Sequence, residues 1–150
     1  MEIVLSVIRP RLWRASEPSR HLLNDYLARI SKSLPAAYEE FRSEAAFWVW
    51  AEKRRGRSPA FLVLSDSQGK QLNSEDFASE LTQVRDRGVQ QLVLAIGPAD
   101  GWTAAAHHRA DLLLSFGKMT LPHELAAVLA AEQIYRATTI WSGHPYHGGH

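Results

Sequence analysis

The 150-residue chain has no cysteine, which removes several kinds of chemistry at once. Without thiols it can form no disulfide, no thiolate zinc site and no cysteine nucleophile. The zinc deaminases are excluded as well, because their metal site needs cysteine ligands. No run of about 18 apolar residues is present, so we expect no membrane span. The first residues, MEIVLSVIRPR, lack a cleavable signal pattern, and a cytoplasmic location is therefore expected.

Two common nucleotide-binding motifs are also missing, since the chain contains neither GxGxxG nor GxxxxGK[ST]. The apolar share of 45% is enough for a core, and the length fits one domain over residues 1–150. The net charge is only +1, but basic residues form two local clusters. Such clusters either contact phosphates or remain solvated surface, and both readings stay open. The clusters are Arg9, Arg11, Arg14 and Arg20, and Lys53, Arg54, Arg55 and Arg57.

Apolar periodicity predicts strands that alternate with helices along the whole chain. The predicted strands are 2–8, 36–41, 60–65, 91–96 and 112–116, and the predicted helices are 18–32, 43–54, 73–88, 103–108 and 123–141. The first helix should turn Leu22, Leu23, Tyr26, Leu27 and Ile30 toward the core. This alternation is typical of an α/β fold with a parallel sheet and helices on both faces.

Three segments that follow strands are candidate ligand loops, because α/β sheets bind ligands at the carboxyl ends of their strands. They are a turn at 66–70, a loop at 97–101 and a loop at 117–122. The middle loop, GPADG, is either a nucleotide-binding turn or an ordinary turn. In the last, GKMTLPH, Gly117 permits close backbone approach, and Met119 and Leu121 offer apolar surface to a flat ring.

The C-terminal tail carries evenly spaced histidines, which invite comparison with a metal site. His144, His147 and His150 lie in a glycine- and proline-containing tail with no carboxylate beside them, so we expect no metal. Arg136 follows Glu132 by four residues, a spacing that allows a simple surface ion pair. Alternatively, Arg136, Tyr146 and His147 supply a cation, a stacking ring and a proton acceptor, which together suit an RNA base and its phosphate.

The stretch GKMTLPHELAAVLAAEQIYRATTIWSGHPYH resembles the C-terminal signature of the RlmH-type large-subunit rRNA methyltransferases, of the SPOUT superfamily. The segments LNSEDFA and AIGPADG resemble the same family, in the same order. The resemblance extends from about Ala60 to His147. It implies a SPOUT fold with a deep C-terminal trefoil knot, a homodimer whose paired knots build the active sites, and S-adenosylmethionine held by three loops.

Carried over by position, the resemblance implies two sets of site residues. The cofactor set is Leu64, Ser65, Gly97, Phe116, Gly117, Lys118, Met119, Thr120 and Leu121. The set for the target base is Arg136, Tyr146 and His147. The implied substrate is N3 of pseudouridine 1915 in 23S rRNA, within the assembled ribosome. His147 would then accept the proton of N3, while Arg136 would hold a phosphate or stabilise the developing anion.

Two other functions are compatible with these residues. One is a SPOUT methyltransferase that acts on a different RNA. The other is a catalytically idle RNA-binding or assembly factor that uses the same dimer. A metal-dependent hydrolase has no support, because the sequence shows no cluster of carboxylates and histidines.

Overall fold

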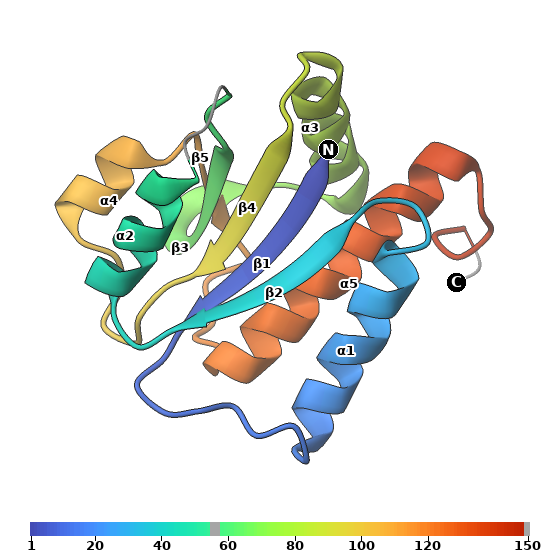
Figure 1. The fold of residues 1–150 in the computed structure, drawn as a ribbon. Coiled ribbons are helices and arrows are strands. Elements are labelled where there is room, and N and C mark those ends of the chain that lie inside the picture. The colour runs from blue at the N-terminus through green and yellow to red at the C-terminus, as the bar shows by residue number, and fades with distance from the viewer. Residues whose placement is uncertain (55–57, 149–150) are drawn as a thin grey trace.

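The structure is a computed structural model that describes residues 1–54 and 58–148. Strands and helices alternate through the described chain, as predicted (Figure 1). The strands are β1 (Glu2–Ile8), β2 (Ala36–Phe41), β3 (Phe61–Gln71), β4 (Gln91–Ile96) and β5 (Leu112–Ser115). The helices are α1 (Pro18–Ile30), α2 (Glu44–Lys53), α3 (Ser74–Asp86), α4 (Ala104–Arg109) and α5 (His123–Ser142). The predicted bounds of β1, β2 and β4 are confirmed to the residue.

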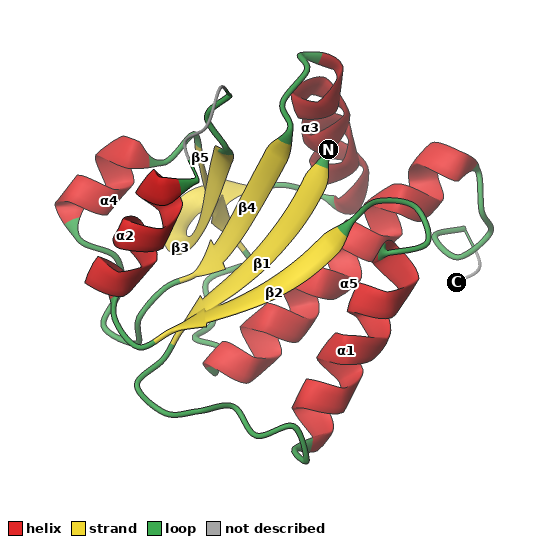
Figure 2. Ribbon diagram, viewed as in Figure 1, coloured by secondary structure: helices red, strands yellow, loops and turns green. Residues whose placement is uncertain are grey.

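The strands form one sheet in the order β2-β1-β4-β3-β5, and every pairing is parallel. Helices α1, α3 and α5 cover one face, and α2 and α4 cover the other (Figure 2). Each face has its own apolar core, with Leu23, Leu81 and Ile134 on the first side and Phe47 and Ala106 on the second. The predicted α/β sheet with helices on both faces is confirmed.

Local side-chain chemistry explains where three of the helices begin. The side-chain oxygens of Ser43, Asn73 and Thr103 each accept a hydrogen bond from the backbone amide three residues further on. These bonds satisfy amides that have no partner within the first turn of a helix. The helices predicted over 43–54 and 73–88 therefore begin within one residue of their predicted starts. Arg55 and Arg57 of the second basic cluster lie outside the described residues.

One predicted core residue of α1 is exposed instead. Leu23 and Ile30 are fully buried, but the side chain of Leu22 remains 45% exposed. Successive residues on a helix point about 100° apart, so Leu22 and Leu23 cannot both face the sheet. The apolar side chains of α1 therefore cover a wider part of the helix surface than the part that packs against the sheet and α5.

The segment 66–70 was predicted as a turn, and this was wrong in part. It lies within β3, which pairs with β5 twice: Ser65 and Lys70 both lie opposite Leu114. The residues between them bulge away from the sheet. At Gly69 the backbone of β3 comes back against that of β5. A Cβ added at this position would lie 2.6 Å from the carbonyl carbon of Leu113. Only glycine fits this crossing without displacing backbone.

Candidate active site

A cleft of about 790 Å³ opens where β4 and β5 end, beside the irregular middle of β3. Its walls are residues 65–67 within β3, residues 96–102 at the end of β4 and residues 116–123 after β5. Parallel neighbours bring their carboxyl ends to one edge of a sheet, which is where such folds bind ligands. Eight of the nine residues expected to bind the cofactor line this cleft. The exception is Leu64, which is fully buried in β3 beside Ser65.

Trp102 joins the first two loops of the cleft. Its indole Nε1 donates a hydrogen bond to the backbone oxygen of Ser65 at 2.9 Å. The same ring packs against Gly97, where an added Cβ would lie 2.6 Å from the indole. Glycine is therefore required at position 97 for close packing, in a loop that could have been an ordinary turn. Sequence reasoning did not assign Trp102 to the site, although it directly follows the GPADG loop.

The third loop combines a fixed backbone with exposed apolar side chains. Gly117 has a φ of 121°, a conformation that favours glycine, and its amide donates to the Ser115 hydroxyl at 3.1 Å. Beyond it, Met119 is 87% and Leu121 is 37% exposed. The loop therefore presents backbone groups and apolar surface to the cleft, as expected for the wall of a pocket that receives a flat ring.

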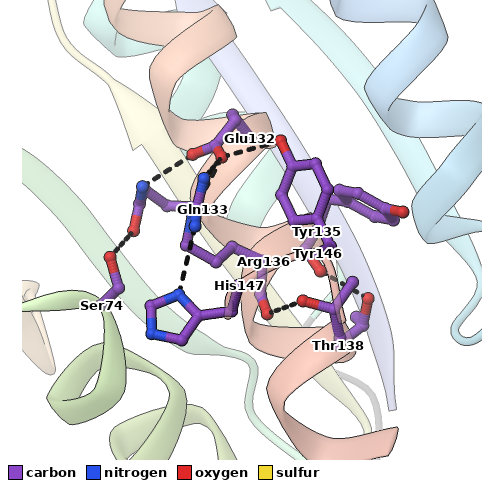
Figure 3. A network of polar contacts seen from close by, with 9 residues as sticks. Ser74, Glu132, Gln133, Tyr135, Arg136, Thr138, Tyr146 and His147 are labelled. Atoms are coloured by element: carbon purple, nitrogen blue, oxygen red, sulfur yellow. Dashed lines mark hydrogen bonds and ion pairs between the residues drawn. The ribbon is translucent and has the colours of Figure 1, made fainter. Parts of the chain in front are cut away.

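The structure brings Arg136, Tyr146 and His147 together, because the tail folds back against α5 and α3 (Figure 3). Arg136 Nη1 lies 3.1 Å from His147 Nδ1. The guanidinium carbon of Arg136 lies 4.8 Å from the centre of the Tyr146 ring, a cation–π distance. The predicted ion pair also forms, with Arg136 Nη2 2.6 Å from Glu132 Oε1. The two interpretations of Arg136 are therefore compatible.

Glu132 is the centre of this polar network. Its Oε1 accepts hydrogen bonds from Arg136 and from the Tyr146 hydroxyl, and its Oε2 accepts one from Gln133. The bond to Glu132 raises the pKa of Arg136. Burial, followed by hydrogen bonding with Tyr26 and Glu132, raises the pKa of Tyr146. At neutral pH Arg136 is therefore a cation and Tyr146 a neutral hydrogen-bond donor.

Within one chain the cleft and the tail network are separate. α5 begins at His123, which lines the cleft, and Arg136 follows 13 residues later. At about 1.5 Å per residue this places Arg136 roughly 20 Å along the helix. A second cavity, of about 460 Å³, lies between them. Phe116 and Gly117 border both cavities, and Ser74 and Gln133 of the tail network line the second one.

The tail histidines are used in hydrogen bonds. His144 Nδ1 accepts from the Tyr146 amide, and His147 lies between Arg136 and Glu75. His150 lies outside the described residues. Within residues 1–54 and 58–148, no group of three or more histidine or carboxylate side chains is placed to hold a metal ion. The helices of the same residues include none with the length and apolar character of a membrane span.

A cleft of loops at the carboxyl edge of a parallel sheet is a ligand-binding arrangement, and comparison with known proteins gives its class. The family model described as "predicted SPOUT methyltransferase" matches residues 13–147. The chain belongs to the SPOUT methyltransferase family, as its C-terminal motifs indicated.

Individual relatives narrow this class. The chain is 50% identical over 129 residues to ribosomal RNA large subunit methyltransferase H of Koribacter versatilis (strain Ellin345), covering 86% of this chain and 88% of that one. It is 44% identical over 147 residues to the protein of the same name from Rhizobium meliloti (strain 1021), covering 87% and 90%.

A solved structure supports the fold. It is the SpoU methyltransferase AviRb from Streptomyces viridochromogenes, in complex with the cofactor AdoMet. The two structures superpose with a TM-score of 0.50 at 18% identity, over 91% of this chain and 57% of that one. This chain therefore spans less than two thirds of AviRb.

Proposed function

We propose that the protein transfers a methyl group from S-adenosylmethionine to N3 of pseudouridine 1915 in 23S rRNA of the assembled ribosome. The observation that carries this proposal is the cleft, which gathers eight of the nine expected cofactor residues from β3 and from the loops after β4 and β5. The names of the relatives, which are ribosomal RNA large subunit methyltransferases, support the substrate class.

The residues of the cleft fit this cofactor. Gly97 and Gly117 allow backbone to approach it closely, while Met119 and Leu121 offer apolar surface to the adenine. Ser65, whose backbone oxygen accepts a hydrogen bond from Trp102, and the neighbouring Leu64 are proposed to form the floor of the cofactor site. When bound, the cofactor supplies a sulfonium methyl that is already electrophilic, so the protein needs no nucleophile of its own.

The active form is proposed to be a homodimer with a trefoil knot near its C-terminus. Arg136 lies roughly 15 Å along α5 from Ala126, the last α5 residue that lines the cleft, so a second copy packed across α5 would bring its tail network to the first copy's cleft. Exposed apolar side chains on this side support such packing: Leu12 is 67%, Leu22 45% and Leu125 54% exposed. The close crossing at Gly69 supports the knot, because chain segments pass one another there at backbone contact.

Three tail residues are proposed to serve the target base. Tyr146 offers its ring for stacking, and Arg136 offers a cation to a phosphate or to the deprotonated base. N3 of the base must lose a proton before it attacks well, and His147 accepts it. A fixed geometry of base and methyl group would supply much of the remaining rate enhancement.

Cofactor binding gives the direct test, by calorimetry on the purified protein. We expect saturable binding of S-adenosylmethionine, and we expect Gly97→Val to weaken it by roughly 10- to 100-fold, because the added side chain displaces Trp102. The control is Gly148→Val, where nothing lies within 4 Å of an added Cβ. Absence of binding by the folded wild-type dimer would reject the proposal in favour of an idle RNA-binding factor.

The first basic cluster leads to a prediction about RNA. Trp13, 1% exposed, anchors the loop between β1 and α1, while the neighbouring Arg11 and Arg14 are exposed. Arg9 in the same loop bonds Glu124 at the start of α5, so the loop lies beside the cleft. Replacing Arg11 or Arg14 with Gln should weaken ribosome binding without altering cofactor binding. Each change should also reduce the salt dependence by about one released counterion.

Filter binding over a salt series would measure this effect, with Arg42→Gln as a control on an exposed arginine. An unchanged slope for both loop variants would mean that the loop does not touch RNA. Methylation assays with ribosomes and with tRNA would separate the proposed target from another RNA.

A further inference from the structure

We infer that Glu75 is a positioning residue for the proposed reaction: it holds His147 in the Nε2–H tautomer and leaves Nδ1 as the nitrogen that accepts the proton. The inference rests on the proposed function. Glu75 lies in the first turn of α3, 72 residues from His147, and its carboxylate Oε1 is 2.7 Å from His147 Nε2. Glu75 lies within the LNSEDFA segment quoted above, but that resemblance assigned it no role.

The tautomer follows from what each partner of His147 is able to do. The guanidinium of Arg136 has only donors, so His147 Nδ1 must accept in the 3.1 Å contact with Arg136 Nη1. A neutral imidazole that accepts at Nδ1 carries its proton at Nε2. The Nε2–H then donates to Glu75, whose carboxylate is an acceptor. The two contacts therefore require the same tautomer.

In the free protein, Arg136 also blocks the nitrogen of His147 that would accept the proton. The lone pair of Nδ1 is directed at Arg136, so a base role needs the guanidinium to move away. A phosphate or an anionic base would attract Arg136 and thereby expose Nδ1. The proton lost by the target nitrogen is then gained by Nδ1. The imidazolium that results keeps its Nε2–H bond to Glu75, whose negative charge offsets the new positive one.

Among the described residues, four charged or titratable groups surround His147, and they act in different directions on its protonation. Glu75 on α3 favours the imidazolium, and Glu132 on α5 does so from further away. Arg136 on α5 opposes it, and the Tyr146 phenol in the tail is neutral. The hydrogen bond from His147 lowers the pKa of Glu75, which keeps this carboxylate ionised. Because the Glu75 side chain is 62% exposed, its removal should leave the fold intact.

The tautomer is measured first, on the full-length protein without RNA, by the ¹⁵N chemical shifts of labelled histidine above the titration range of the imidazole. We expect a protonated Nε2 and a bare Nδ1 at His147 in the wild type. Glu75→Ala should lose this preference, and Asp76→Asn, in the same helical turn, should keep it. The opposite tautomer, or one indifferent to Glu75→Ala, would overturn the inference. This measurement does not depend on the methyl acceptor.

Kinetics then test the catalytic consequence. Glu75→Ala should lower kcat by roughly 10-fold or more with an unchanged KM for S-adenosylmethionine, because tautomer and charge are both lost. Glu75→Gln still accepts the Nε2–H bond, so it should recover part of kcat, with the acidic limb of its pH–rate profile moved to lower pH. A wild-type profile and kcat in both variants would overturn the positioning role. Inactivity of the wild-type protein on ribosomes would instead count against the proposed function.

Discussion

Gly69→Ala should destabilise the protein by about 2–3 kcal/mol, a large change for a single methyl group. The new Cβ would lie 2.6 Å from the carbonyl carbon, 2.7 Å from the carbonyl oxygen of Leu113 and 2.8 Å from the amide nitrogen of Leu114. All three contacts are with backbone, which cannot rotate away as a side chain can. Either β3 or β5 must shift, and the pairing of Lys70 with Leu114 must weaken.

Denaturant unfolding followed by circular dichroism measures this change, with Gly148→Ala as the matched control. Position 148 also lacks a left-handed backbone, and nothing lies within 4 Å of its added Cβ. The control should keep the wild-type midpoint. Equal midpoints for the two variants would show that the backbone of β5 is not packed closely against Gly69.

His147→Ala should lower turnover by about 100- to 10,000-fold, the usual contribution of a general base. Cofactor affinity should not change, because His147 is absent from the described residues that line the cleft. The variant also removes the acceptor for Arg136 Nη1, but Arg136 keeps its bonds to Glu132. The guanidinium should therefore stay in place while proton removal fails.

Single-turnover methylation of ribosomes measures the effect, with excess enzyme so that product release does not limit the rate. His108→Ala, on the exposed end of α4, is the control and should behave as wild type. A wild-type rate for His147→Ala with intact folding would remove the histidine from the mechanism. Solvent or a phosphate would then be the proton acceptor.

Much of the fold could be predicted from the sequence because its signals are local. The alternating, Ile- and Val-rich segment 2–8 and the apolar run 91–96 predicted β1 and β4 to the residue. Side chains such as Ser43 and Asn73 marked the starts of helices, since a capping residue acts within its own turn. The error at 66–70 has the opposite origin. Polar and glycine residues there look like a turn, and only the distant pairing of Lys70 with Leu114 extends the strand.

The residues of the candidate site also differ in whether their signals are local in the sequence. Gly97 and Gly117 stood out because each follows an apolar strand, and the cleft gathers their loops. Trp102 and Glu75 were not assigned, because their roles come from contacts with Ser65 and His147 that are far apart in sequence. In the sequence, Glu75 is indistinguishable from the acidic residues that commonly occupy the first turn of a helix, where the helix dipole favours them.

The strand order constrains how the nascent chain can fold during translation. β4 lies between β1 and β3, so residues 2–8 gain their second neighbour only once residue 96 has been synthesised. β5 then closes the edge more than 40 residues after β3 began. Until β4 has been synthesised, only the β1–β2 pair with α1 can form, and β3 has no strand beside it. Long-range parallel pairing of this kind slows folding, so we expect chaperones to accompany this small protein until its C-terminal helix is complete.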